Sequence, residues 1–285
     1  MGRKKSKGLF YYIWMMFYGV GLAVFYIIKY IFIGIFTVFK FSAKTTATAV
    51  KKSAEKRAVA KAESVKPKVT AKYVGLEEAK AISGDLKQFE HKVMHAESTI
   101  GIILGARGTG KSAIGMKLME NVHASTGKSV FAMGFNPEDL PSWIKVVEGI
   151  DQISNDSFVL VDEGGITFSS RKSMSNANQL LSSLLLIARH KNISVLFITQ
   201  NSSNLEVNVL RQADFLILKP SSLLQKDFER KIIKELYESI EADFDKLEDI
   251  KGMTYIHSDS YRGFATNELP SFWSTKVSKA FKEKK

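Results

Sequence analysis

The 285-residue chain contains no cysteine, which excludes disulfide bonds and thiolate metal sites. Acidic residues are scarce in the first quarter of the chain: residues 1–75 hold 15 of the 41 Lys and Arg but only 2 of the 29 Asp and Glu. That segment carries a net charge of +13, and residues 76–285 carry −1. The basicity is confined to the N-terminal segment, so the overall charge of +12 points to a membrane surface before it points to nucleic acid.

Charge is also almost absent from Leu9–Phe39, where Lys29 is the one charged residue. Leu9–Ile28 alone gives 20 uncharged residues, enough to cross a bilayer core of ~30 Å. The run lacks the short core and small-residue cleavage site of a signal peptide. We therefore predict a basic flank and transmembrane helix in residues 1–41, acting as a single-pass N-terminal anchor.

Residues 42–72 form a basic, Ala- and Lys-rich stretch without apolar periodicity, which predicts a linker near anionic headgroups. Basic residues flank both ends of the apolar run. The longer basic stretch follows it, which favours the cytoplasmic side for the remaining domain. A shallow hairpin with both ends on that side also satisfies the charges, so the topology of residues 29–40 stays open.

A phosphate-binding signature follows at Gly105–Ser112, GARGTGKS, which fits G-x-x-x-x-G-K-[ST] at every fixed position. An apolar run, Ser98–Leu104, precedes the signature, and a helical pattern, Ala113–Val122, follows it. We expect backbone amides of the loop to bind the phosphates of ATP, and Lys111 to reach the β- and γ-phosphates. The predicted ATP-binding residues are Gly105, Ala106, Arg107, Gly108, Thr109, Gly110, Lys111, Ser112 and Ala113.

About fifty residues later, Phe158–Glu163 reads FVLVDE, an apolar strand that ends in two carboxylates. We predict that Asp162 and the Ser112 hydroxyl hold Mg²⁺, and that Glu163 polarises the attacking water. The strand Ile193–Thr199 ends next to Gln200. If this strand lies between the other two, Gln200 reaches the γ-phosphate as a sensor.

Strand and helix patterns alternate, which predicts an α/β fold: a P-loop NTPase with a mostly parallel central sheet flanked by helices. We assign residues 73–285 to this ATPase domain. Its C-terminal part reads as a hairpin around Asp259 and Ser260, and the Glu/Lys-rich segment Phe228–Lys246 as an exposed helix. The further expected strands are Ser129–Phe135, Ser157–Asp162, Asp214–Leu218, Met253–Ser258 and Tyr261–Thr266, and the further expected helices are Asn178–His190 and Gln225–Ile240.

The order of these motifs resembles the FtsK–HerA superfamily of P-loop ATPases, which has the additional strand and the catalytic glutamate. The likeness lies in GxxxxGKS, the Asp-Glu strand, ARHKNISVLFITQ and LRQADFLILK, and it covers roughly residues 98–220. The superfamily includes DNA translocases, viral genome-packaging ATPases and Zot-like assembly proteins. The resemblance implies a homo-oligomeric ring, a hexamer in many members, in which Arg189 or Arg211 acts on the γ-phosphate of the neighbouring subunit.

The resemblance and the anchor together predict a membrane-anchored ATP-hydrolysing motor that translocates double-stranded DNA, in viral genome packaging or in DNA transfer. Its location would be a cellular membrane or a virion membrane. The alternative is a Zot-like assembly or secretion ATPase that acts on proteins or virions, with capsid or membrane assembly proteins as partners. A Zot-like protein usually carries its anchor after the ATPase domain, whereas the anchor predicted here precedes it.

Overall fold

The computed structural model describes residues 18, 29–30, 69–164, 174–274 and 277. The chain divides into two compact units, Met1–Ser64 and Val65–Lys285. The predicted membrane span, Leu9–Phe39, lies almost wholly outside the described residues. Among the residues that are described, no helix has both the length and the hydropathy for a bilayer crossing.

The described part of the second unit is built on one nine-stranded sheet with the order β1-β9-β8-β7-β2-β6-β5-β3-β4. All pairs from β7 to β4 are parallel, and β8, β9 and β1 extend the sheet by antiparallel pairing. The strands are β1 (Glu77–Gly84), β2 (Ile100–Leu104), β3 (Ser129–Met133), β4 (Ile144–Val146), β5 (Ser157–Asp162), β6 (Ile193–Ile198), β7 (Phe215–Leu218), β8 (Thr254–Ser258) and β9 (Tyr261–Thr266).

The sheet confirms the predicted α/β architecture. Strand β6 lies between β2 and β5, as the sensor hypothesis requires. The predicted hairpin is also present, with Thr254 opposite Ala265 in the β8–β9 pair. Strands β1 and β4 were not predicted from the sequence. Every residue of β1 is exposed, and β4 has only three residues, so neither gives the apolar pattern of a buried strand.

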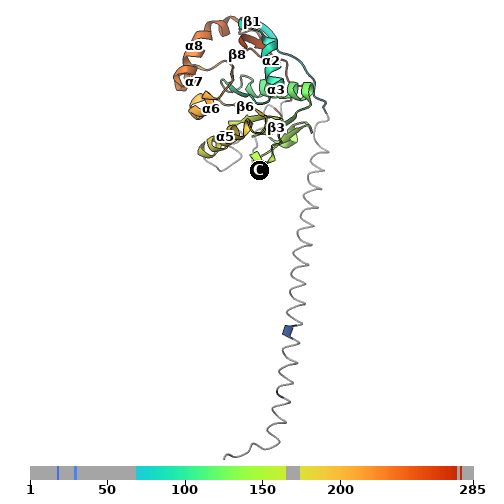
Figure 1. Cartoon of the computed structure of the whole chain (residues 1–285). Coiled ribbons are helices and arrows are strands. Elements are labelled where there is room, and N and C mark those ends of the chain that lie inside the picture. Colours follow the sequence, from blue (N-terminus) through green and yellow to red (C-terminus); the bar gives the residue numbers. More distant parts are fainter. Residues whose placement is uncertain (1–17, 19–28, 31–68, 165–173, 275–276, 278–285) are drawn as a thin grey trace, which may run out of the picture. The chain divides into compact units, whose positions relative to one another are not determined.

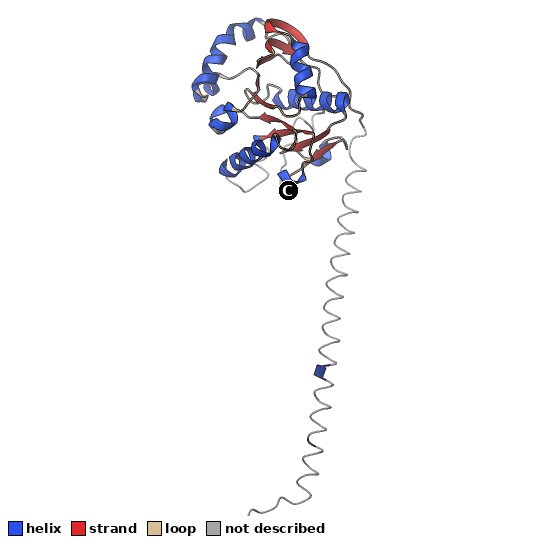
Figure 2. Cartoon of the chain, viewed as in Figure 1, coloured by secondary structure: helices blue, strands red, loops and turns tan. Residues whose placement is uncertain are grey.

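Helices flank the sheet on both faces (Figures 1 and 2). The predicted helix Gln225–Ile240 is divided in the structure, where Glu229 and Arg230 have extended backbones between two helices. The expectation that Phe228–Lys246 is merely exposed was wrong for one face, because Ile233, Tyr237 and Ile240 are buried. The helices are α2 (Leu86–His95), α3 (Lys111–Thr126), α5 (Met174–Ala188), α6 (Val207–Arg211), α7 (Leu223–Phe228) and α8 (Lys231–Lys246).

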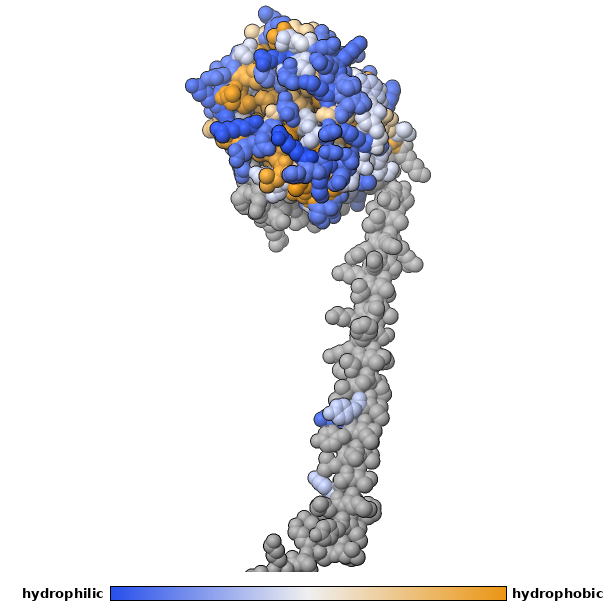
Figure 3. Space-filling model, viewed as in Figure 1, coloured by the Kyte–Doolittle hydropathy of each residue, from blue (hydrophilic) through white to orange (hydrophobic). Residues whose placement is uncertain are grey.

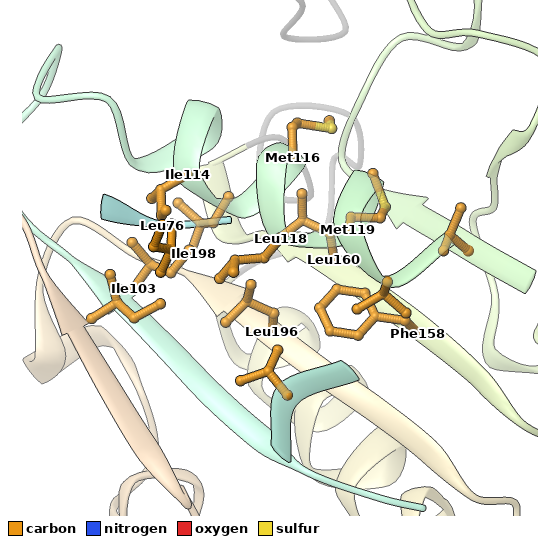
Figure 4. Packing of buried hydrophobic residues seen from close by; sticks show 14 of the residues in the cluster. Leu76, Ile103, Ile114, Met116, Leu118, Met119, Phe158, Leu160, Leu196 and Ile198 are labelled. Carbon is orange, nitrogen blue, oxygen red and sulfur yellow. The ribbon is translucent and has the colours of Figure 1, made fainter. Parts of the chain in front are cut away.

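Alternating strand residues supply two hydrophobic cores, one on each face of the sheet. On one face, Ile103, Leu160 and Leu196 pack beneath α3, which brings Ile114 and Leu118 onto the sheet (Figure 4). The neighbouring residues of the same strands point to the opposite face, where they meet apolar side chains of α5, α6 and α8. Burial on both faces explains why the central strands are continuous apolar runs.

Helix α3 also holds polar groups in the interior. Lys117 and Glu120 form an ion pair with a 3.2 Å Nζ–Oε2 distance, and their side chains are 2% and 0% exposed. The Glu120 carboxylate also accepts hydrogen bonds from the Ser271 backbone N–H at 3.1 Å, the Ser271 hydroxyl and the Lys72 N–H. One residue on, Asn121 bonds both backbone groups of Val74. Helix α3 is therefore hydrogen-bonded to backbone near both ends of the described domain, at residues 72 and 74 and at residue 271.

The surface is mostly hydrophilic on the face shown in Figure 3, with hydrophobic side chains between the polar ones. Large exposed apolar residues occur on neighbouring helices at four-residue spacing, namely Leu224 and Phe228 of α7 and Ile232 of α8. Each is roughly two-thirds to three-quarters exposed. These residues contribute nothing to the two cores.

The buried ion pair predicts a large stability difference between two similar substitutions. Glu120→Gln leaves the Lys117 ammonium buried without its counter-charge, so we expect it to lower the free energy of unfolding by about 3–5 kcal/mol. Glu235→Gln breaks the exposed pair with Lys231 and should change the free energy of unfolding by less than about 1 kcal/mol. Urea titration followed by tryptophan fluorescence measures both. Equal effects of the two substitutions would contradict the assigned burial of the α3 pair.

Candidate nucleotide site

The site begins where the central strand β2 ends and α3 starts. Between them the chain turns through Gly105, Gly108 and Gly110, which have φ angles of 149°, 82° and 93°. These positive values favour glycine, since a Cβ would be strained there. Gly110 is the N-cap of α3 and offers no side chain to the first helical amides. The N-terminus of this 16-residue helix is therefore open to an anionic ligand.

Lys111, the first residue of α3, folds back over the loop. Its Nζ donates hydrogen bonds to the carbonyl oxygens of Gly105 at 2.7 Å and Ala106 at 2.8 Å. Burial lowers the pKa of Lys111 to about 8, although the charge of Asp162 acts in the opposite direction. The ammonium is thus held at the loop by neutral carbonyls. Phosphate oxygens would be stronger acceptors for it, because charge-assisted hydrogen bonds are the stronger ones.

Ser112 and Asp162 meet from α3 and the end of β5. The Ser112 Oγ lies 3.5 Å from Asp162 Oδ2, and Asp162 is only 5% exposed. Strands β2 and β5 are both parallel to β6, so their carboxyl ends reach the same edge of the sheet. A hydroxyl and a carboxylate are hard oxygen ligands of the kind Mg²⁺ prefers. The two residues therefore fit the predicted metal role.

Glu163 follows Asp162 at the same sheet edge. Its carboxylate accepts a hydrogen bond from the Thr199 hydroxyl at the end of β6. Burial raises the pKa of Glu163, and the neighbouring charge of Asp162 raises it further, whereas hydrogen bonds from the Thr199 and Asn204 side chains lower it. A half-buried carboxyl with a raised pKa is a better proton acceptor near neutral pH than a solvated one.

Gln200 comes directly after Thr199 and is exposed at this edge. The backbone carbonyl oxygen of Gln200 accepts a 2.6 Å hydrogen bond from the Gln225 side chain of α7. Sequence reasoning gave the sensor role to Gln200 and missed Thr199, which is the residue that contacts Glu163. The strand end FITQ places the Thr199 hydroxyl next to the Gln200 amide. Neighbouring residues of a strand point to opposite faces, so a pattern alone does not decide which of the two side chains faces Glu163.

The loop after β6 is fastened to the junction of α7 and α8. Glu229 accepts from the backbone N–H of Ser202 at 2.8 Å and from its hydroxyl. Arg230 donates to the carbonyl oxygens of Ser202 at 3.1 Å and Leu205 at 2.6 Å. Glu229 is only 7% exposed, so these charge-assisted bonds lie in a largely dry place. They fix the backbone on which Thr199 and Gln200 depend.

The structure does not bring the two candidate arginines to this edge. Arg189 follows α5 just before β6, and Arg211 ends α6 just before β7. Both are exposed and lie at the amino ends of these parallel strands, whereas the loop lies at the carboxyl ends. Within one chain, neither arginine is placed to contact a phosphate on the loop. A role in a neighbouring subunit stays a prediction.

The remaining residues of the predicted ATP site lie in the loop and at the start of α3. Thr109 donates through its hydroxyl to the Ala106 carbonyl at 2.8 Å, which closes the loop on itself. Arg107 and Gly108 are exposed at the loop's tip, and Ala113 is buried under it. A glycine-rich loop between strand and helix, with a lysine, a serine and two carboxylates at one edge, defines the class of P-loop nucleotide-binding domains.

Comparison with known families supports that class. Residues 113–217 match the family model described as Zonular occludens toxin (Zot). This match confirms the resemblance to the Zot-like ATPases that the motif order predicts. Among curated proteins, none matches the chain.

Several solved structures are similar in part. The DNA-packaging ATPase B204 of Sulfolobus Turreted Icosahedral Virus is 17% identical with a TM-score of 0.41, over 61% of this chain and 100% of that one. The genome packaging NTPase B204 of Sulfolobus turreted icosahedral virus 2, in complex with AMPPCP, is 14% identical with a TM-score of 0.42, over 61% and 99%. The pCW3 conjugation coupling protein TcpA with ATPgS is 12% identical with a TM-score of 0.41, over 71% and 70%.

The loop geometry predicts different costs for two glycine substitutions. A Cβ at Gly105 would lie 2.6 Å from the Cβ of Lys219, whereas a Cβ at Gly108 would meet nothing within 4 Å. Gly108→Ala should cost only the backbone strain of a positive φ, about 1–2 kcal/mol. Gly105→Ala should cost a further 1–3 kcal/mol or so from overpacking. Thermal unfolding of both variants checks this order, and the reverse order would contradict the close approach of Lys219.

Proposed function

We propose that the chain is an ATP hydrolase that converts the energy of hydrolysis into mechanical work. The observation that carries this proposal is the meeting, at one sheet edge, of Lys111, the Ser112–Asp162 pair and the half-buried Glu163. A nucleotide-binding protein without turnover needs the first two features but has no use for the third. Glu163 therefore favours hydrolysis over binding alone.

In this proposal each residue has one task. The amides of residues 108–112 and the Lys111 ammonium bind the β- and γ-phosphates of ATP, and Lys111 exchanges its two carbonyl acceptors for phosphate oxygens. Ser112 and Asp162 hold Mg²⁺, which would neutralise part of the phosphate charge. Glu163 accepts the proton of a water molecule whose oxygen bonds to the γ-phosphorus, while the bond from that phosphorus to the ADP oxygen breaks.

Thr199 and Asn204 are positioning residues in this scheme. Their hydrogen bonds to Glu163 orient the carboxylate and hold back the rise of its pKa. Gln200 adds an amide at the same edge, next to Thr199. Since the backbone of this loop is bonded to the α7–α8 junction, a change at the γ-phosphate would be passed to these helices.

We propose double-stranded DNA as the first candidate substrate of the motor, in genome packaging or DNA transfer. The sequence resemblance to the FtsK–HerA superfamily supports this choice. The net charge of −1 over residues 76–285 does not favour strong static binding of DNA. A translocating ring needs only a few contacts per subunit, so weak binding is compatible with movement along the duplex.

The second candidate is a Zot-like motor that assembles or secretes proteins or virions. The observation in its favour is the family match over residues 113–217. In either case we propose a homo-oligomeric ring with ATP between subunits. Arg189 and Arg211 are exposed away from the chain's own site, which is compatible with a role on a neighbour's γ-phosphate.

We also propose that the N-terminal segment anchors the motor in a membrane, with the ATPase domain on the cytoplasmic side of a cell or at a virion membrane. The support is the uncharged run Leu9–Ile28 and the basic residues on both sides of the apolar segment. The restriction of basic charge to residues 1–75 agrees with a location against anionic lipid.

The decisive experiment is the steady-state ATPase rate of the full chain in detergent, with and without double-stranded DNA. Glu163→Gln should still bind ATP but turn it over at least about 100-fold more slowly, since a positioned general base contributes that much. Lys111→Ala should abolish turnover and weaken nucleotide binding. Near-normal turnover in either variant would move the catalytic site elsewhere.

The DNA arm of this experiment separates the two candidates. Several-fold stimulation by DNA, absent in Glu163→Gln, supports translocation. Robust hydrolysis that ignores DNA would overturn that proposal and favour the assembly motor.

The anchor has its own test. Deletion of residues 1–41 should move the protein from the membrane fraction to the soluble fraction, because the deletion removes the apolar run. Replacing Lys51 and Lys52 by Gln is a matched control that leaves the span intact and should leave the protein in the membrane fraction. If the deleted form still sediments with membranes, the span is not the anchor.

A further inference from the structure

Lys219, directly after β7, is buried against the phosphate loop. Its backbone N–H donates to the Leu104 carbonyl at 2.8 Å, and the N–H of Ala106 donates to the Pro220 carbonyl at 3.0 Å. The chain that leaves β7 thus pairs with the chain that enters the loop from β2. Lys219 is the last residue of the segment LRQADFLILK, for which the sequence predicts no role beyond a strand, and the hydrolysis scheme above does not use it.

The side chain of Lys219 follows the loop from its first glycine to its last. At the start, its Cβ lies 2.6 Å from the position of a Cβ on Gly105. At the end, its Cε and Nζ lie 3.9 and 4.0 Å from the position of a Cβ on Gly110. Gly110 is the N-cap of α3, so the ammonium lies next to the helix end that faces the phosphates.

The environment of this ammonium is unusual for a lysine. The residue is only 1% exposed, and its Nζ donates to the carbonyl oxygens of Gly252 at 2.7 Å and Met253 at 3.2 Å. Among the described residues, no carboxylate forms an ion pair with it. Burial of a charge without a counter-charge is costly. Accordingly, burial lowers the pKa of Lys219 to about 7.

We propose that Lys219 is an electrostatic part of the phosphate site, whose buried ammonium lies beside the loop and offsets the negative charge of bound nucleotide phosphates without touching them. This inference rests on the proposed ATP binding. A buried charge acts on its neighbours through a low effective dielectric constant and with little screening by salt, so contact is not required. In this proposal, the negative charge of the bound phosphates balances the positive charge of the Lys219 ammonium.

The proposal has a consequence that a structural lysine would not show. In the empty protein, the Lys219 ammonium loses its proton near neutral pH; with phosphates at the loop, the charged form is favoured. Nucleotide binding at pH 8 should therefore be accompanied by proton uptake at Lys219. Two further titratable groups contact the same backbone: Lys111, whose pKa is also lowered, bonds the Gly105 carbonyl, and the Tyr237 hydroxyl donates to the Lys219 carbonyl at 3.2 Å.

Isothermal titration calorimetry of the full chain in detergent tests the proposal. ATPγS with Mg²⁺ is titrated at pH 8 in buffers of different ionisation enthalpy, which yields both the Kd and the number of protons taken up. Lys219→Gln keeps a donor for the Gly252 carbonyl but has no charge. We expect its Kd to rise roughly tenfold, as the loss of one unit charge near a polyanion implies. Its proton uptake should fall by more than half a proton relative to the wild type.

A matched control is Lys128→Gln, because Lys128 also bonds a backbone carbonyl, that of Ala96, but at a distance from the loop. This variant should bind ATPγS and take up protons as the wild type does. If Lys219→Gln does not fold, Lys219→Arg serves in its place. An arginine stays charged, so the variant should keep its affinity and still take up over half a proton less than the wild type.

The outcomes separate this proposal from the proposed function. If the wild type binds no ATPγS, the assignment of the phosphate loop fails. If the wild type binds and Lys219→Gln binds with equal affinity and equal proton uptake, the role of Lys219 is refuted. A wild-type uptake near zero at pH 8 would refute it as well, whatever the variants do.

Discussion

The site depends on the parallel pairing of β2, β6 and β5. Parallel strands end at the same edge of a sheet, so this pairing brings together the loop after Leu104, the carboxylates after Val161 and the hydroxyl of Thr199. Packing on both faces then fixes the register, because a slip by one residue would exchange side chains between the two cores and disrupt their fit against the helices. The positions of Lys111, Glu163 and Thr199 relative to one another follow from that register.

Much of this arrangement was predictable from the sequence. The central strands are apolar runs and the loop has a fixed spacing, so patterns predicted these elements and a mostly parallel sheet. The place of β6 between β2 and β5 was a condition of the sensor hypothesis, and the strand order meets it. Strand β1 gave no such signal, since all of its residues are exposed. The buried face of α8 was misread because Glu and Lys dominate its composition, although Ile233, Tyr237 and Ile240 follow a helical period.

The contacts inside the site were less accessible to sequence reasoning. Thr199 and Gln200 are neighbours, and only the course of the backbone decides which of them meets Glu163. Lys219 follows a strand, as many surface lysines do, yet it is buried, and its ammonium bonds the carbonyls of Gly252 and Met253, more than thirty residues later in the chain. Packing between distant parts of the chain determines both the Thr199–Glu163 contact and the burial of Lys219. A local sequence pattern contains no information about such packing.

Helix α3 is attached at both of its ends. Its first turn carries the phosphate loop, and its second half is bonded to the backbone of residues 72 and 74 through Glu120 and Asn121. Residues 42–72 lead directly into that bonded segment. The carbonyl of Val69 is bonded as well, because the Trp143 Nε1–H donates to it at 2.9 Å. If residues 42–72 act as the predicted linker, tension along it would reach the Trp143 bond first and the hydrogen bonds to α3 next. In the proposed function, the helix that begins at the phosphate loop would then also carry part of the load from the chain's N-terminal side.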